Sequence, residues 1–222
     1  MSDLTLVIPA KYESLSLPQV LKELENFRYN IIIVLEENDK DTIKSVENFS
    51  CKIIFQKNKG YGDALIEGIK NVKTKYYCIF NADGSFVPGE IDGMIKKLET
   101  ERLHIIFGSR YQKNSGSEDD TIVTLIGNFI FTLIGKIFFK LNISDILYTY
   151  VLGLTSNTLN LDLKQKDFSF CVELPIKAKR NNLKLGSINS YERKRIAGKK
   201  KVNAIKDGFL ILKYMILLFF KR

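Results

Sequence analysis

The sequence predicts an α/β fold in which helices cover both faces of a mostly parallel sheet. In the first half of the 222-residue chain, short apolar runs alternate with helix-like segments, an order typical of parallel sheets. The hydrophobic fraction of 45% is enough for a sizeable core rather than a disordered chain. We expect one domain over residues 1–201 and a basic, apolar, amphipathic C-terminal helix over residues 202–222.

Five apolar runs have the length and β-branched content of buried strands, and we expect them to form the sheet. Between them lie four segments that predict helices. The first helix begins near Ser16, which can cap it, and Pro18 suits its first turn. The strands are Leu4–Ile8, Ile31–Leu35, Cys51–Phe55, Lys75–Phe80 and Leu103–Phe107, and the other helices Asp41–Asn48, Tyr61–Val72 and Pro88–Glu99.

The second half predicts fewer, longer elements. A long apolar helix is expected over Ile122–Leu141, another helix over Cys171–Arg180, a strand over Leu183–Ile188 and a last helix over Val202–Phe220. The first of these is near the length that spans a bilayer. It contains polar residues, so we favour a helix in the membrane interface, with a buried core helix as the alternative.

Charge is unevenly distributed along the chain. The net charge is +9, but residues 176–222 hold 14 basic and 2 acidic residues, a net +12. Such a tail predicts an anionic partner, and its apolar residues suit a lipid surface better than a nucleic acid. We therefore expect peripheral contact with the cytoplasmic face of a membrane through residues 122–141 and 205–222, and no nucleic acid. A homodimer through the same surface explains the pattern nearly as well.

Cysteine and histidine usage narrows the chemistry. Cys51, Cys78 and Cys171 are widely spaced, which predicts free thiols in a reducing cytoplasm. The N-terminus lacks the features of a signal peptide. The one histidine, His104, lies in an apolar run and is expected to be a strand residue. Catalytic triads and zinc sites built on histidine are therefore disfavoured.

The loops that follow the strands are the candidate site, because open parallel sheets bind ligands beyond the carboxyl ends of their strands. Asp83 lies in such a loop, where a carboxylate can bind Mg²⁺ or Mn²⁺ together with substrate phosphates. A plain Asp-Gly turn is the alternative for this dipeptide. Lys59–Ala64 combines a glycine loop with a helix start, which favours a phosphate.

These segments, taken in order, resemble the family 2 glycosyltransferases of the Rossmann-like GT-A fold, and within them the dolichyl-phosphate mannose synthase and polyprenyl-phosphate glycosyltransferase branch. The resemblance covers roughly residues 4–201. It is carried by Val7-Ile8-Pro9-Ala10…Glu13, Ile31–Asp41, Lys59-Gly60-Tyr61-Gly62-Asp63-Ala64, Asn81-Ala82-Asp83-Gly84-Ser85, Gly108-Ser109-Arg110-Tyr111 and Arg195-Ile196-Ala197-Gly198-Lys199-Lys200-Lys201.

The resemblance implies a GDP- or UDP-linked sugar donor and a Mg²⁺ or Mn²⁺ ion. It implies catalytic roles for Asp83, Arg110 and Glu173, with Arg110 reaching the donor sugar or its phosphate. Asn81 and Asp83 stand at the family's Asp-x-Asp and would ligate the metal. The remaining donor-binding residues implied in this way are Pro9, Ala10, Tyr12, Glu13, Glu36, Asp63, Ala82, Ser85, Arg195 and Lys201.

Three departures from the family pattern leave the acceptor open. Asn81 removes one negative charge from the metal site, and Lys200 replaces a serine. An acidic run, Glu118–Asp120, stands where that branch is basic, and acidic residues repel a phosphate. A polyprenyl phosphate acceptor is partly a dianion, with a second pKa near roughly 6, and needs no strong base.

A glycan hydroxyl needs a carboxylate base instead, for which Asp119, Asp120, Asp145 and Glu173 are candidates. The resemblance implies direct in-line attack with inversion for either acceptor. Two further hypotheses are a degenerate protein that binds nucleotide-sugars without turnover and a sugar nucleotidyltransferase. The latter enzymes have a glycine-rich loop after the first strand. Here that loop is Pro9–Glu13 and contains no glycine.

Overall fold

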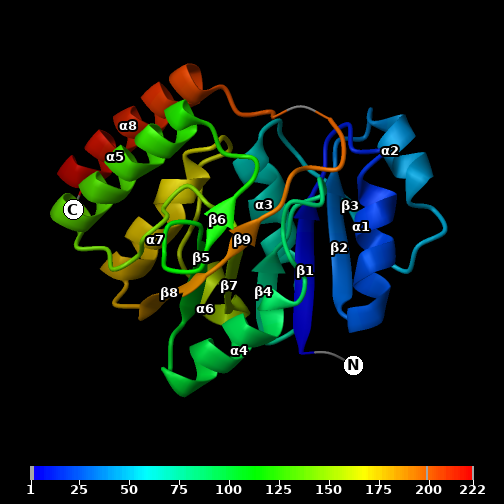
Figure 1. The fold of residues 1–222 in the computed structure, drawn as a ribbon, viewed down its shortest axis with the longest axis horizontal. Coiled ribbons are helices and arrows are strands. Elements are labelled where there is room, and N and C mark those ends of the chain that lie inside the picture. Colours follow the sequence, from blue (N-terminus) through cyan, green and yellow to red (C-terminus); the bar gives the residue numbers. More distant parts are fainter. Residues whose placement is uncertain (1–2, 199, 222) are drawn as a thin grey trace.

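The computed structural model describes residues 3–198 and 200–221, so Lys199 of the basic motif and Arg222 of the last helix lie outside the described residues. Its centre is a seven-stranded sheet (Figure 1). All the strand pairs are parallel except the two made by β7. In spatial order the strands are β3 (Lys52–Phe55), β2 (Asn30–Leu35), β1 (Leu4–Pro9), β4 (Tyr76–Ile79), β7 (Val151–Leu154), β5 (Ile105–Ser109) and β8 (Leu185–Asn189).

The predicted α/β class is confirmed, but the strand β7 was not predicted. It is inserted antiparallel between β4 and β5, opposing Cys78 with Leu152 and Phe107 with Val151. Gly153 lies in its middle, and a side chain there would meet the Tyr77 ring at 2.9 Å. Since glycine lets a neighbouring group approach the backbone closely, this residue allows a tyrosine of β4 to lie across the strand.

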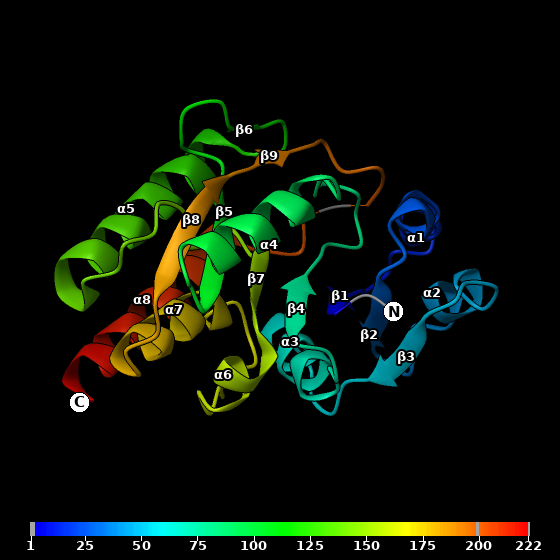
Figure 2. The same cartoon turned by 90° about the horizontal axis from the view of Figure 1, so that it is seen from below.

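Helices cover both faces of the sheet. One buried cluster contains the apolar faces of α1 (Leu17–Leu24) and α4 (Glu90–Thr100). The other contains those of α3 (Tyr61–Lys70), α7 (Phe170–Arg180) and α8 (Ala204–Phe220). Figure 2 shows α4 and α3 on opposite sides of β4. The shorter elements are η1 (Glu25–Phe27), α2 (Lys40–Ser45) and α6 (Thr155–Leu159).

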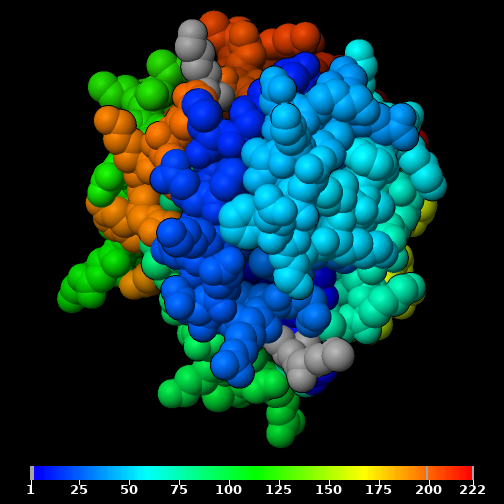
Figure 3. All heavy atoms as spheres, turned by 90° about the vertical axis from the view of Figure 1, so that its right-hand side faces the viewer, coloured from blue at the N-terminus to red at the C-terminus, as the bar shows by residue number. Residues whose placement is uncertain are grey.

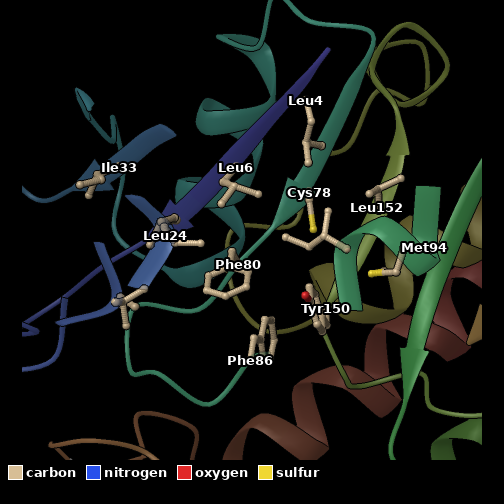
Figure 4. Close-up of a cluster of buried hydrophobic side chains, with 14 of the residues drawn as sticks. Leu4, Leu6, Leu24, Ile33, Cys78, Phe80, Phe86, Met94, Tyr150 and Leu152 are labelled. Carbon is tan, nitrogen blue, oxygen red and sulfur yellow. The ribbon is translucent and has the colours of Figure 1, made fainter. Parts of the chain in front are cut away.

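An aromatic group supports the end of β4 (Figure 4). The Phe86 and Tyr150 rings are stacked with their centroids 4.4 Å apart, and Phe80 meets Phe86 edge-on at 5.7 Å. The Tyr150 hydroxyl donates to the Val87 carbonyl at 2.7 Å. These buried contacts hold the loop over residues 81–88 on a rigid base.

The apolar helix α5 (Ile122–Phe139) lies beside α8 on the outside of the molecule (Figure 1). Thr121 caps α5 in a reciprocal pair with Thr124. Ser16 does not cap α1 as predicted. Its backbone is already helical, with φ of −94° and ψ of −44°, whereas a capping residue is typically extended, and its hydroxyl donates to the Glu13 carboxylate at 2.6 Å.

A second, two-stranded sheet joins distant segments of the chain. β6 (Gly116–Ser117) pairs in parallel with β9 (Tyr191–Glu192). β9 leads into the basic segment, which we call the strap and define as residues 193–198 and 200–201. Figure 3 shows this orange segment against the blue N-terminal quarter, where Arg193 pairs with Glu23 at 2.9 Å.

Candidate functional site

A cavity of about 810 Å³ lies at the carboxyl ends of the central strands, where the sequence predicted the site. The loops after β1, β2, β4 and β5 reach it, the strap crosses it, and α5 and α8 form its far wall. The predicted site residues that line it are Pro9, Ala10, Tyr12, Glu13, Glu36, Asn81, Ala82, Asp83, Arg110, Arg195 and Lys201. The sheet edge therefore brings together residues that are widely separated in sequence.

The loop after β1 is held in place by the start of α2. Tyr12 has a left-handed backbone, with φ of 53°, which a residue other than glycine adopts only when its surroundings impose it. Its N–H donates to Asp39 at 2.6 Å, and the N–H of Glu13 donates to Thr42 at 3.0 Å. This leaves the Tyr12 ring 62% exposed at the cavity edge, where it can stack on a flat ring.

The acids predicted to meet the nucleotide are paired with lysines. Glu36 accepts from Lys11 at 2.7 Å. Glu13, which is 7% exposed, pairs with Lys201 of the strap. Lys11 was missed as a site residue, although it stands inside the predicted loop, because a surface lysine carries no signal of its partner. The charges of these two acids are thus compensated within the site.

The turn after β4 presents Asp83 to the cavity. Gly84 has φ of +83°, a conformation that favours glycine, and the N–H of Ser85 donates to Asp83 Oδ1 at 3.0 Å. The Nδ2 amide of Asn81 donates to Ser85 Oγ at 3.2 Å. Ser85 therefore shapes the turn from below, and it does not line the cavity.

The donor set at this turn fits a divalent cation that takes its other ligands from phosphate and water. Within the part of the chain that the structure describes, no three His, Cys, Asp or Glu residues come close enough to hold a metal. Asp83 is one carboxylate and Asn81 one amide, and Mg²⁺ in phosphate-transfer sites typically uses only one or two carboxylates. The residues thus suit a cation that arrives with a diphosphate.

The strap crosses directly above the turn. The N–H of Ile196 donates to the Asp83 carbonyl at 2.8 Å, and that of Arg193 to the Ser85 carbonyl at 2.8 Å. A side chain at Gly84 would meet Ile196 at 2.5 Å. Arg195 Nη1 then lies 3.6 Å from Asp83 Oδ2. The glycine therefore serves both the turn and the close approach of the strap.

Arg110 lines the cavity but is held among buried groups. Its guanidinium donates to Asp145 at 2.8 and 3.0 Å and to Glu192 at 3.0 Å, and it lies 4.5 Å from the centre of the Tyr148 ring. Burial alone lowers the pKa of Arg110, but the charge and hydrogen bonds of Asp145 raise it well above its usual value. The side chain is thus a fixed positive charge in the cavity wall.

The acidic run is occupied by partners within the chain. Asp119 pairs with Arg195 at 2.7 Å and with Lys200 at 3.3 Å. Glu118 accepts from the Tyr191 hydroxyl at 2.8 Å, and Asp120 accepts from Tyr111 and Thr124. The Asp119 charge is thus compensated by cations of the strap, and the repulsion of a phosphate by this run stays a prediction.

Two more predicted residues lie outside the cavity lining. Asp63 accepts from the backbone and side chain of Asn58 at 2.8 and 2.9 Å, so it orders the loop before α3. Glu173 is fully buried and accepts from the N–H of Gln165 at 2.8 Å, from Tyr214 at 2.9 Å and from Lys177 at 2.8 Å. These contacts give Glu173 a structural role, which joins α7 to α8, and its catalytic role stays a prediction.

Part of the lining could not be chosen from the sequence. The rings of Tyr61 and Phe168 are stacked with centroids 5.0 Å apart and both line the cavity. Phe168 and Phe86 carry no signal in the sequence that separates them from core residues. Asp119 and Lys200 were noted as departures from a family pattern, and only the fold shows that they meet.

The cavity continues away from the strand ends between the two outer helices. Val123, Ile126 and Ile130 of α5 line it from one side, and Gly208 and Ile211 of α8 from the other. The lining therefore changes from charged groups around Asp83 to mainly aliphatic groups between the helices, with Asn128 and Asp207 among them. A ligand with a polar end and an apolar chain matches this gradient.

The fold and this cavity define a glycosyltransferase of the GT-A type. The model of glycosyl transferase family 2 matches residues 5–157, and the chain belongs to that family. The match covers β1 to β7 and includes the turn at Asp83 and the loop at Arg110. The strap and α8 lie beyond it.

Curated relatives match most of the chain. The UDP-N-acetylglucosamine–dolichyl-phosphate N-acetylglucosaminyltransferase of Methanococcus voltae is 26% identical over 209 residues, which is 82% of this chain and 82% of the relative. A Methanocaldococcus jannaschii protein without an assigned activity is 27% identical over 196 residues, or 84% of this chain and 79% of that protein.

Solved structures share the fold at low identity. Glucosyl-3-phosphoglycerate synthase from Mycobacterium tuberculosis, in complex with Mn²⁺, UDP and phosphoglyceric acid, superposes with a TM-score of 0.72 at 11% identity, covering 96% of this chain and 75% of the synthase. The same enzyme with Mg²⁺ and UDP gives a TM-score of 0.69 at 10% identity, covering 97% of this chain and 78% of that one.

Proposed function

We propose that the protein transfers a sugar from a UDP-sugar to a polyprenyl phosphate at the cytoplasmic face of a membrane, with inversion. The observation that carries the proposal is the continuous cavity from Asp83 to the apolar space between α5 and α8. The dolichyl-phosphate relative and the UDP-bound neighbours support it. GDP-sugars are the alternative donors to be compared.

The diphosphate of the donor is assigned to the turn and the strap. Asp83 and Asn81 would hold a Mg²⁺ or Mn²⁺ ion, as the complexes of the neighbours with these metals suggest. When bound, such an ion neutralises the charge that develops on a leaving diphosphate. Arg195, Lys200 and Lys201 line the same part of the cavity and would face the phosphates from above.

The acceptor is assigned to the opposite end of the same cavity. A phosphate monoester with a second pKa near roughly 6 is already a nucleophile at neutral pH, so no base has to take a proton. Asp119 and Asp120 also line the cavity. Burial raises the pKa of each carboxyl. Hydrogen bonds and nearby cations lower it by more, so each pKa lies below its usual value and both groups are weak bases. These observations favour a phosphate acceptor over a glycan hydroxyl.

The outer helices form the surface that would meet the membrane. Apolar side chains are exposed along both, with Phe129 66% exposed on α5 and Phe209 68% exposed on α8. Within the described residues, α5 is the one helix long and apolar enough to span a bilayer. Its Asn128 and Thr132 are buried and bonded to the loop beneath, so we assign it to lie in the interface.

Cations border this apolar surface. Lys136 and Lys140 lie near the end of α5, and Lys213 and Lys221 lie on or just after α8. A second cavity of about 220 Å³ at the far end of the helix pair is lined by Phe139, Phe219, Lys140 and Arg180 among others. Basic side chains beside an apolar face suit a leaflet with anionic lipids. A homodimer through this face is the competing occupant.

A transfer assay tests the proposal. Protein with Mn²⁺ is incubated with radiolabelled UDP- or GDP-sugars and liposomes that contain polyprenyl phosphate. The expected product partitions into organic solvent, and Asp83→Ala abolishes it, whereas Asp92→Asn, at an exposed carboxylate of α4, retains it. Transfer to a soluble glycan, or binding of the donor with no transfer to lipid, contradicts the proposal.

A further inference from the structure

Asp119 pairs with two cations in the cavity wall. Its carboxylate accepts from Arg195 Nε at 3.2 Å and Nη2 at 2.7 Å, and Lys200 Nζ lies 3.3 Å away. The three side chains are only 13%, 18% and 29% exposed. Because charges at this depth are costly unless they are paired, Asp119 holds both cations in place.

Arg195 is shared between two acids. Its Nη2 bonds Asp119, while its Nη1 lies 3.6 Å from Asp83 Oδ2. One guanidinium therefore stands beside the carboxylate to which the proposed function assigns a cation and a diphosphate. Donor binding at Asp83 then requires this guanidinium to move or to change its partner.

We propose that Asp119 is an exchangeable counter-ion for the strap, and that the diphosphate of the donor replaces it as the partner of Arg195 and Lys200. The inference rests on the proposed function, because it takes the donor to be a nucleoside diphosphate sugar. Asp119 is a positioning residue: it keeps two phosphate-binding cations over the turn while the site is free of donor. It also opposes the donor, since a carboxylate and a phosphate compete for the same cations.

The fold supplies a fixed support for this exchange. The pairing of β6 with β9 fixes the main chain next to Asp119, and the N–H of Lys194 donates to Glu118 at 3.3 Å. The N–H of Ile196 is tied to the Asp83 carbonyl at 2.8 Å. The backbone on both sides of Arg195 is therefore held, so its side chain can change partner without loss of the strap.

Nucleotide binding to the full chain tests the proposal. Calorimetry with UDP and with GDP, each with Mn²⁺, compares the wild type with Asp119→Asn. We expect Asp119→Asn to lower the Kd by about three- to tenfold, as removal of one competing charge does at a partly buried pair. Glu118→Gln is the matched control, because it removes the negative charge of the neighbouring residue. The Glu118 carboxylate contacts Tyr191 and Lys194, and its loss should change the Kd less than twofold.

The outcomes separate the two proposals. A wild type that binds neither nucleotide contradicts the proposed function and this inference together. Wild-type binding with an equal or higher Kd for Asp119→Asn overturns the inference alone. In an Arg195→Gln/Lys200→Gln background, Asp119→Asn should have no effect, and a gain that persists there also overturns it. Asp119→Glu keeps the carboxylate and should therefore have the wild-type Kd, whereas a variant that had lost its fold would not bind the nucleotide.

Discussion

The amide of Asn128 donates a hydrogen bond of 2.7 Å to the carboxylate of Asp145, which joins the middle of α5 to the acid that holds Arg110. The same amide accepts from the N–H of Leu147 at 3.0 Å. Asn128 is 1% exposed, so its polar atoms are satisfied beneath an otherwise apolar helix. The position of α5 is thus specified by hydrogen bonds to the protein on its inner side.

Replacing Asn128 with leucine should destabilise the fold although it makes α5 more apolar. The change leaves the Leu147 N–H without its acceptor and removes one of the donors to Asp145, which keeps Arg110, and unmade buried hydrogen bonds cost about 1–3 kcal/mol. Urea unfolding measures the loss, with Ile130→Leu at an exposed site of the same helix as the control. Equal stability of the two variants would refute the anchoring role of Asn128.

Replacing Glu173 with glutamine should lower stability more than turnover. The carboxylate is fully buried and serves two backbone N–H groups, Lys177 and Tyr214. Breaking such a set costs about 3–5 kcal/mol, measured by denaturant unfolding, while transfer per folded molecule should change only a few-fold. A stable variant that has lost all transfer would restore the catalytic role that the sequence suggested.

Replacing Asn81 with aspartate should tighten the metal site. The variant adds a second carboxylate beside Asp83, and more ligand charge raises the affinity for a hard cation. We expect the Mn²⁺ concentration at half-maximal UDP binding to fall by about three- to tenfold, read by a thermal-shift titration. Asp83→Asn should shift it in the opposite direction, and a shift of both variants in one direction is incompatible with a metal at this turn.

Serine at both Phe129 and Phe209 should weaken attachment to vesicles. Each ring is more than half exposed on the outer helices, and full burial of such a side chain contributes about 1.5–3 kcal/mol. Flotation with anionic liposomes should show at least about tenfold less bound protein. Leu159→Ser, at an exposed apolar residue of α6, is the control. If the double variant instead turned a dimer into a monomer with unchanged flotation, the surface would be a dimer interface.

The cysteines should differ in reactivity. The structure confirms three free thiols. Burial raises the pKa of all three, that of Cys171 to about 12, and only the thiolate reacts. At pH 8 a disulfide reagent should modify Cys51 first and reach Cys78 and Cys171 only in urea.

The same thiols give a pH dependence. A raised folded pKa contributes stability that is present below the unfolded pKa of about 8.5 and is lost as pH rises towards the folded value. The Tm should therefore decline above about pH 8.5, and Cys171→Ala should lessen that decline. A decline of the same size in this variant would assign the effect to other groups.

The sequence predicted the parallel half of the sheet because each strand there is a compact apolar run followed by a polar loop. It did not predict β7, since Val151–Leu154 is only four residues long and its position depends on pairing with β4 and β5 from other parts of the chain. The long apolar helices were predicted in place, and their exposure on the outside required the fold.

The site was predicted where a residue directly follows a strand, as at Glu13, Glu36 and Asp83, all of which line the cavity. Two other suggested carboxylates, Asp63 and Glu173, do not line the cavity, and a sequence does not show which way a helical side chain faces. The pairing of Asp119 with the strap joins segments brought together by the β6–β9 sheet, which no local pattern foretells.

The antiparallel strand β7 also sets the width of the site. Because β7 separates β4 from β5, the turn at Asp83 and the loop at Arg110 lie two strand spacings apart, about 10 Å, instead of one. The chain between them at this edge is the one that enters β7 and carries Tyr148. The strand that interrupts the parallel order therefore sets the distance between these two loops across the cavity.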